Sequence, residues 1–210
     1  MDLLVATRSA HKMAEIRRIL ADLGAIRLLS LADLGLSPQP AEDGLEPYDT
    51  FEANARSKAA YFRSRSGLTT VADDSGIVVD LLDGAPGVRS KRFAPGAEDL
   101  DGPDQDEANN IYLVASLSEA PAAERAAHYV CVAVLDTGEG EPVVFEGKAH
   151  GVILTAPRGS GGFGYDPLFY DEELGRTFAE ISQDTKNEHS HRGRAFRALA
   201  KHLESELDRS

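Results

Sequence analysis

The 210-residue chain is 42% hydrophobic, which is enough to fold as one sizeable α/β domain or as two small lobes that share a core. Its 35 acidic residues exceed its 22 basic residues, which argues against a nucleic-acid partner, because nonspecific duplex binding depends on Lys and Arg contacts to phosphates. The single Cys131 excludes an internal disulfide and a cysteine-based zinc site, and the lack of a long apolar run or a basic leader predicts a cytoplasmic protein with no membrane partner.

A strand, a polar turn and a helix make up the first predicted unit. Residues 3–6 are an apolar run typical of a buried strand, and the following helix is expected to stop at Gly24. The apolar face of this helix carries Met13, Ile16, Leu20 and Leu23. The loop at 7–12 brings hydroxyls and cations to a helix N-terminus, which favours phosphate binding. Alternatively, Ser9 is only an N-cap and Lys12 a solvated first-turn residue.

A second strand is predicted at 27–31, followed by a proline-rich acidic loop at 36–49, a composition usual at a protein surface. Thr50 is expected to cap a helix over 51–65. The apolar stripe of that helix consists of Phe51, Ala55, Ala59 and Phe62. Lys58 lies near the stripe, where it either extends past the core into solvent or faces an anion.

The stretch at 69–80 places two carboxylates between two β-branched runs. Successive strand side chains face opposite sides of a sheet, so Asp73 and Asp74 cannot both face the core, and at least one should face a cleft. Ser75 and Gly76 are expected to turn the chain between two strands. Carboxylates at a stiff strand end suit Mg²⁺, which takes oxygen ligands, although an ordinary acidic turn would look the same.

The middle of the chain predicts a basic cluster, a helix and a hairpin. The basic cluster at 88–93 is either a surface patch or a site for phosphate oxygens. The helix that follows it includes the apolar residues Ile111, Val114 and Leu117. Strand-like runs at 126–135 and 142–154 then form a long hairpin, which implies an antiparallel component in the sheet.

A glycine-rich loop at 159–164 formally matches the dinucleotide motif G-x-G-x-x-G. We interpret this match as accidental. The motif should open a helix, but Asp166 and Pro167 follow the loop, and residues before proline avoid the helical region. The glycines instead allow the backbone to approach a flat ligand, with Phe163 or Tyr165 stacking on a purine and Asp166 accepting from a ring N–H. The alternative is a mobile surface loop.

Two basic residues, His191 and Arg192, precede the last predicted helix, and Lys186 lies upstream of them. Positive charge at a helix start opposes the helix macrodipole, so helix stability does not explain these residues. They could donate to a carbonyl on a base. A lone histidine is otherwise more often an exposed or structurally satisfied residue.

Six segments occur together in an order and spacing that mark a known family, and they lie at 6–12, 50–58, 72–76, 84–87, 161–167 and 186–193. On these segments the chain resembles the inosine/xanthosine triphosphate pyrophosphatases, which remove deaminated purine nucleotides. The resemblance covers nearly the whole chain. Its most specific parts are the D-D-S-G stretch, the G-G-F-G-Y-D-P loop and the S-H-R-G helix start.

The resemblance implies an α/β fold with an elongated mixed β-sheet flanked by helices, and a single domain over 1–210 whose two lobes hold the nucleotide in a central cleft. It also implies a homodimer. The substrate would be a purine nucleoside triphosphate such as ITP, dITP or XTP. It would be hydrolysed to the monophosphate and pyrophosphate with Mg²⁺ as cofactor.

The same resemblance assigns roles to residues. Asp74 would be the general base and a metal ligand, Asp73 would support it, and Glu42 would be a second metal ligand. Phosphates and sugar would be held by Thr7, Arg8, Ser9, Ala10, His11, Lys12 and Ser75. The base would be bound by Phe163, Gly164, Tyr165, Asp166, Lys186, His191 and Arg192.

This chain departs from the family pattern in its first loop. Ser9 stands where the family usually has asparagine, and Arg8 and His11 replace common glycines. Two alternatives stay open from the sequence: a Maf-type nucleotide diphosphatase with a different base preference, and a nucleotide-binding sensor without turnover. The sequence also leaves open whether Asp73 or Asp74 takes the proton.

Overall fold

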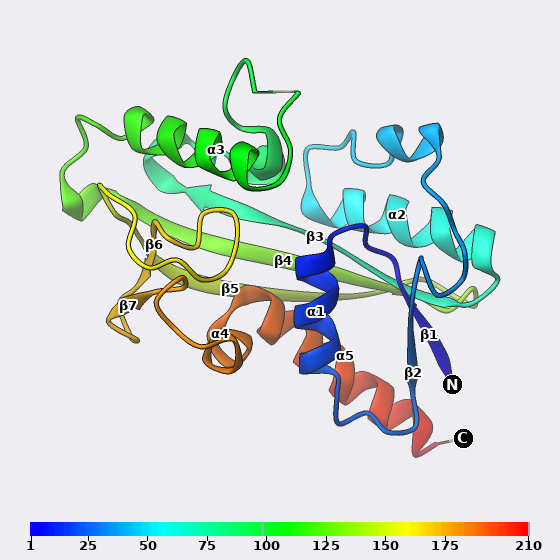
Figure 1. Ribbon diagram of the computed structural model, residues 1–210. Helices are drawn as coiled ribbons and strands as arrows, with labels where there is room; N and C mark the ends of the chain where they lie inside the picture. The colour runs from blue at the N-terminus through cyan, green and yellow to red at the C-terminus, as the bar shows by residue number, and fades with distance from the viewer. Residues whose placement is uncertain (98, 210) are drawn as a thin grey trace. The chain divides into compact units, whose positions relative to one another are not determined.

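The computed structural model describes residues 1–97 and 99–209 and contains a seven-stranded sheet with the strand order β2-β1-β3-β4-β5-β6-β7 (Figure 1). The strands are β1 Asp2–Val5, β2 Arg27–Ser30, β3 Thr69–Val79, β4 Ala126–Asp136, β5 Val143–Ile153, β6 Phe169–Asp171 and β7 Arg176–Thr177. β1 pairs in parallel with β2 and β3, whereas β6 pairs antiparallel with β5 and β7. The prediction of an α/β fold with a mixed sheet is confirmed.

Helices connect and flank these strands (Figure 1). The α-helices are α1 Ala10–Ile19, α2 Phe51–Ser66, α3 Gly102–Ser116, α4 Gln183–His189 and α5 His191–Leu207. Short 3-10 helices are η1 Pro40–Gly44, η2 Asp80–Leu82, η3 Gly87–Arg92 and η4 Ala122–Glu124. Within the described part of the chain, none of the helices combines the length and the apolar character needed to cross a bilayer. The sequence analysis missed α4, whose residues are almost all polar.

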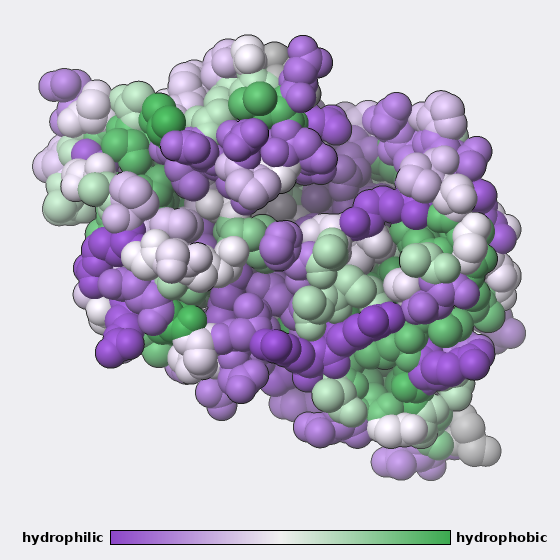
Figure 2. All heavy atoms as spheres, in the orientation of Figure 1, coloured by the Kyte–Doolittle hydropathy of each residue, from purple (hydrophilic) through white to green (hydrophobic). Residues whose placement is uncertain are grey.

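The chain divides into two compact units, each built from separated segments. The first unit comprises Met1–Asp74, Cys131–Gly147 and the chain from His191 onward, and the second comprises Ser75–Val130 and Lys148–Ser190. β3, β4 and β5 therefore each contribute residues to both units. Charged residues make up 27% of the sequence, and hydrophilic side chains accordingly cover much of the face shown in Figure 2.

The core of the first unit packs α1 and α5 against β1, β3 and β4. Ile16, Leu20 and Leu23 are buried in it, as their spacing predicts. The prediction that the first helix stops at Gly24 is wrong, because α1 ends at Ile19. Leu20 is its C-cap, and the turn after the helix still buries Leu23.

The predicted second helix is confirmed as α2 and has its expected ends. Thr50 is the N-cap, and its hydroxyl accepts a hydrogen bond from the Ala53 N–H at 3.2 Å. Gly67 follows the helix with a left-handed backbone at φ 72°, the conformation that favours glycine at a helix end. Ala55 and Phe62 of the predicted stripe are buried.

β3 is one continuous strand, so the prediction of a turn at Ser75 and Gly76 is wrong. Gly76 serves close packing instead of chain reversal. A Cβ placed on it would lie 2.3 Å from the Gly87 carbonyl oxygen and 2.4 Å from Ser90 Oγ, so only glycine lets η3 lie against the strand. The Ser90 hydroxyl in turn accepts from the Ile77 N–H at 2.8 Å.

Replacing Gly76 with alanine is expected to lower the free energy of unfolding by about 1–3 kcal/mol, because the added methyl group forces backbone of the second unit to move. Gly24→Ala is the matched control, since no atom lies within 4 Å of a Cβ at that position. Urea unfolding of both variants measures the difference. Equal midpoints for the two variants would contradict this account of Gly76.

α3 follows its apolar pattern only in part. Leu117, its C-cap, is buried, and Val114 packs partly buried against the core of the second unit. Ile111, however, is 63% exposed, and the buried residues within the helix are Gln105, Asn109 and Leu113. Asn109 Oδ1 accepts from the N–H groups of Phe93 and Ala94 at 3.1 and 2.9 Å. The need to satisfy these buried backbone groups places a polar residue on the inner face, which hydrophobic spacing cannot predict.

Candidate active site

Asp73 of β3 lies in a buried cluster of charges in the first unit. Its Oδ2 is 3.0 Å from Lys12 Nζ and 3.5 Å from Arg192 Nε, and the Cys131 thiol donates to it at 3.8 Å. Burial on its own would raise the pKa of Asp73, but the nearby positive charges of Lys12, Arg192 and Lys58 outweigh burial and hold this pKa well below its usual range. Asp73 therefore stays ionised and is a poor proton acceptor.

Arg192, at the start of α5, is bound by carboxylates. Its NH1 donates to Glu15 Oε2 at 2.5 Å, and the side chains of Arg192 and Glu15 are only 2% and 5% exposed. The sequence analysis expected Arg192 to donate to a base. The contacts within the first unit instead explain the positive charge at this helix start, because they hold Arg192 between Glu15 and Asp73.

The side chain of Asp74 contacts α2, whereas the side chain of Asp73 contacts Lys12 of α1 and Arg192 of α5. Asn54 Nδ2 donates to Asp74 Oδ2 at 3.0 Å, and Lys58 Nζ is 3.8 Å from Asp74 Oδ1. Burial raises the pKa of Asp74, and the charges of Lys58 and Lys12 offset it only in part. Of the two neighbouring carboxylates, Asp74 is therefore the one suited to accept a proton.

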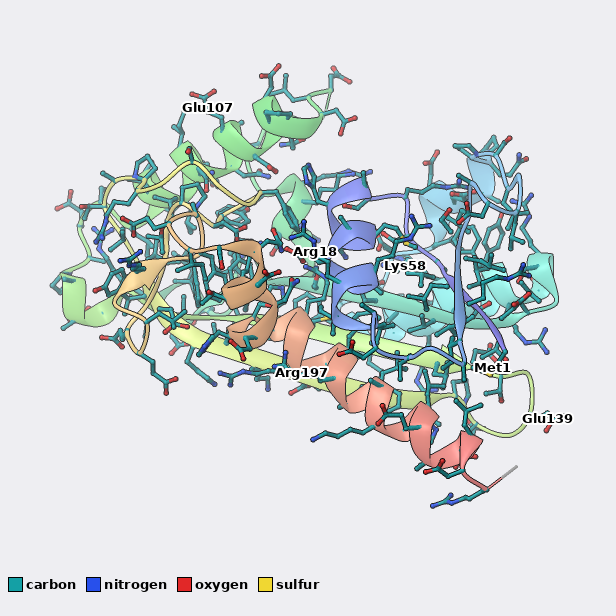
Figure 3. The ribbon with its side chains drawn as sticks, turned by 60° about the horizontal axis from the view of Figure 1, so that its bottom comes forward. Met1, Arg18, Lys58, Glu107, Glu139 and Arg197 are labelled. Atoms are coloured by element: carbon teal, nitrogen blue, oxygen red, sulfur yellow. The ribbon has the colours of Figure 1, made fainter. Side chains whose placement is uncertain are left out.

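Lys58, labelled in Figure 3, faces this cluster and does not extend into solvent. Its ammonium group donates to the Asp73 carbonyl oxygen at 2.6 Å and to Glu46 Oε1. Glu46 thus shares Lys58 with Asp74, a role that the sequence analysis missed because Glu46 lies in an acidic surface loop.

The first loop is held by its own side chains and by the loop after β2. Ser9 is the N-cap of α1, accepting from the Lys12 N–H at 3.3 Å, and the Thr7 hydroxyl accepts from the Ser9 N–H at 3.2 Å. Ala10 is the first residue of α1, and His11 follows it at the exposed surface. The alternative role of Ser9 as an N-cap is confirmed, and Lys12 is bound to Asp73.

Arg8 holds Glu42 with two hydrogen bonds. Arg8 Nε and NH2 donate to the two carboxylate oxygens of Glu42 at 2.9 and 2.7 Å, and NH1 donates to the Leu36 carbonyl oxygen at 2.7 Å. The guanidinium also lies 5.7 Å from the centre of the Phe62 ring. Both oxygens of Glu42 are therefore occupied, and the pKa of Glu42 is lowered chiefly by its hydrogen bond from Arg8.

The second unit holds a separate group around the glycine-rich loop. Lys186 of α4 donates to Asp166 Oδ2 at 2.5 Å, and both side chains are 3% exposed. Asp166 Oδ2 also accepts from the Phe163 N–H at 2.9 Å. The Lys186 ammonium lies 4.6 Å from the centre of the Phe163 ring, which is close enough for a cation–π interaction.

Tyr165 belongs to the core of the second unit, so the expectation that it stacks on a ligand is wrong. Its hydroxyl donates to the Ser90 carbonyl oxygen at 2.8 Å, and the side chain is 4% exposed. Burial raises the pKa of Tyr165 well above its usual range. Phe163, which is only half-buried, is the remaining candidate for stacking.

Gly164 is held by two residues that the sequence analysis did not identify. Its N–H donates to Asp106 Oδ2 at 2.7 Å, and its carbonyl oxygen accepts from Asn110 Nδ2 at 3.0 Å. Asp106 and Asn110 both come from α3, which the sequence did not connect with a binding site. No local sequence signal connects them to a loop more than 50 residues later.

The predicted site residues therefore form two groups. Those in the first unit are Thr7, Arg8, Ser9, Ala10, His11, Lys12, Glu42, Asp73, Asp74, His191 and Arg192. Those in the second unit are Ser75, Phe163, Gly164, Tyr165, Asp166 and Lys186. The first group combines carboxylates with lysines beside the N-terminus of α1, which suits phosphates and a cation. The second combines an aromatic ring with a buried ion pair, which suits a flat polar ring.

Known proteins of similar sequence match almost the whole chain. A dITP/XTP pyrophosphatase of Geobacter sulfurreducens is 47% identical over 201 residues, which are 96% of this chain and 96% of that protein. A dITP/XTP pyrophosphatase of Thermus thermophilus is 45% identical over 199 residues, covering 95% of this chain and 90% of the other.

Solved structures also match almost the whole chain. A HAM1 protein of Coxiella burnetii matches with a TM-score of 0.84 at 32% identity, covering 98% of this chain and 99% of that one. A nucleoside-triphosphatase, or dITP/XTP pyrophosphatase, of Mycobacterium abscessus matches with a TM-score of 0.71 at 41% identity, covering 95% and 98%. The sequence model of the Ham1 family matches residues 3–202. The chain belongs to the Ham1 family.

Proposed function

We propose that this protein hydrolyses deaminated purine nucleoside triphosphates, such as ITP, dITP and XTP, to the monophosphate and pyrophosphate. The relatives named dITP/XTP pyrophosphatases support this activity. The observation that carries it is the pair of adjacent carboxylates on β3, which differ in environment: Asp73 is held ionised by Lys12 and Arg192, and Asp74 is buried with a raised pKa. Such a pair suits a hydrolytic site, in which one carboxylate accepts a proton and the other fixes positive charge.

The triphosphate binds in the first unit at the N-terminus of α1. Free N–H groups of a helix start favour anions, and Lys12 lies in the first turn of α1. Lys58 adds a second ammonium group beside Asp74. These two cations stabilise negative charge that develops on the departing pyrophosphate. Arg8 contributes to this site by fixing the loop, since its guanidinium is already bound to Glu42.

Asp74 acts as the general base. Its Oδ2 is fixed by the Asn54 amide at 3.0 Å, which sets the direction of the carboxylate. A water that donates a proton to Asp74 becomes a better nucleophile toward phosphorus, and the raised pKa of Asp74 brings it closer to working pH. Lys58 stabilises the carboxylate without removing its proton affinity, because burial dominates the balance.

The residues near Asp74 fit a Mg²⁺ ion that arrives with the nucleotide. Mg²⁺ usually binds through one or two carboxylates plus substrate phosphates, and it would lower the pKa of a bound water. Across residues 1–97 and 99–209, no group of three or more His, Cys, Asp or Glu side chains could hold a metal ion by itself. Asp74 and Glu46, which share Lys58, are the ligands we propose. Glu42 could serve only after Arg8 releases it.

The base binds at the second group, where Phe163 offers a ring face and Lys186 a buried ammonium. A purine with a carbonyl at position 6 can accept a hydrogen bond that an amine at that position cannot. A buried donor left without an acceptor costs free energy, so a site built for the carbonyl discriminates against adenine.

The test is an assay of pyrophosphate release from ITP, XTP, ATP, GTP, UTP and TTP, each with and without Mg²⁺. We expect ITP and XTP to be preferred, and pyrophosphate to be released only with the cation. A preference for UTP or TTP would favour the Maf-type alternative. Equal rates for ITP, ATP and GTP would contradict the proposed selectivity.

A further inference from the structure

Two side chains of α3 hold both backbone polar groups of a single residue in the glycine-rich loop. Asp106 Oδ2 accepts from the Gly164 N–H at 2.7 Å, and Asn110 Nδ2 donates to the Gly164 carbonyl oxygen at 3.0 Å. Asp106 and Asn110 are four residues apart on the helix, so they lie on the same face. The peptide groups on either side of Gly164 are therefore fixed from α3.

The position of Gly164 makes these hydrogen bonds relevant to the base. Gly164 follows Phe163 directly, and its backbone has φ 62°, a left-handed conformation that glycine adopts without strain. On the other side, Tyr165 is fixed by its hydroxyl bond to Ser90. The backbone that carries the Phe163 ring is held by its own N–H bond to Asp166 and, through Gly164, by the bonds to α3.

Asn110 makes its bond at a cost. Its Oδ1 is buried and has no hydrogen-bond partner among the described residues. An unpaired buried acceptor costs about 1–3 kcal/mol. A small apolar residue at this position would avoid that cost but would leave the Gly164 carbonyl oxygen without this donor. The hydrogen bond to the loop therefore accounts for the amide.

We propose that Asp106 and Asn110 are positioning residues for base recognition: they fix Gly164 and thereby place Phe163 for stacking on the purine. This inference rests on the proposed function, because it deepens the role of the same loop. Both residues belong to the second unit, whereas the proposed phosphate-binding residues and the proposed general base Asp74 belong to the first. Their loss should weaken the binding of the base and leave the chemical step intact.

The experiment compares Asp106→Ala, Asn110→Ala and the conservative Asp106→Asn, which keeps an oxygen acceptor for the Gly164 N–H. Glu107→Ala is the matched control, since Glu107 is exposed on the same helix (Figure 3). For each variant we measure KM and kcat for ITP and the Kd of IMP by calorimetry. Both alanine variants are expected to raise KM and Kd about tenfold, the factor that corresponds to 1.4 kcal/mol, with kcat within about twofold. Asp106→Asn should restore most of the affinity.

The outcomes distinguish a failure of the positioning role from a failure of the proposed function. Unchanged KM and Kd in both alanine variants, even with a lower melting temperature, would mean that the two residues only stabilise the fold. If the wild-type protein does not hydrolyse ITP, the proposed function fails, and the IMP affinities of the variants still decide the positioning role. If the wild type binds neither ITP nor IMP, both are overturned.

Discussion

Asp74→Asn is expected to lower the rate of ITP hydrolysis by about a thousandfold, within the range that general-base catalysis contributes, while ITP still binds. The amide is nearly isosteric with the carboxylate but cannot accept the proton of an attacking water. Asp74 is buried against Asn54 and Lys58, so the substitution changes a group that these two residues hold in place. Single-turnover rates and ITP binding by calorimetry measure the two effects separately.

Asp22→Asn is the control for this substitution, since Asp22 is exposed in the same unit. Its rate should equal that of the wild type. A thousandfold loss in Asp73→Asn together with an undiminished rate in Asp74→Asn would reverse the roles of the two carboxylates. A wild-type protein that binds ITP without turnover would instead support the sensor alternative.

Arg192→Met is expected to lower the free energy of unfolding by about 3–5 kcal/mol, because removing one partner of a buried ion pair leaves buried charge without compensation. Arg192 contacts both Glu15 and Asp73, and its side chain is 2% exposed. Methionine fills a similar volume and cannot neutralise either carboxylate. The loss should appear as a lower urea midpoint with an unchanged slope.

Arg194→Met is the matched control for this variant. Arg194 lies on the same helix, α5, but is exposed, and a change of an exposed charge usually alters stability by less than about 0.5 kcal/mol. A midpoint for Arg192→Met equal to that of Arg194→Met would show that the buried ion pair contributes nothing to the fold.

Local patterns predicted β1 to β5, the longer helices and the pair of carboxylates, but not α4, β6 or β7. The alternation of side chains along a strand predicts that Asp73 and Asp74 cannot both face the core. Their partners do differ, since Lys12 contacts the first and Asn54 the second. Both carboxylates are nevertheless buried, at 3% and 7% exposed, so burial does not separate them as predicted. Helix spacing and caps likewise predicted the core residues and the start of α2 at Thr50. These properties depend on residues that are close together in the sequence, so they can be recognised from one sequence alone.

Contacts between distant residues were not predictable. Gly76 looks like a turn residue, but η3 packs against it, and that packing depends on the fold. Tyr165 looks like a stacking aromatic, yet its hydroxyl is bound to Ser90, 75 residues away in sequence. Composition also could not tell that Arg8 would bind Glu42 and leave Glu46 beside Lys58.

The most direct test of the account is a competition in which the wild-type protein receives equimolar ITP and ATP with Mg²⁺ and every product is quantified by chromatography. The account predicts that IMP forms about a hundredfold faster than AMP, with one pyrophosphate for each IMP. Accumulation of IDP and phosphate, or of AMP as fast as IMP, would contradict it.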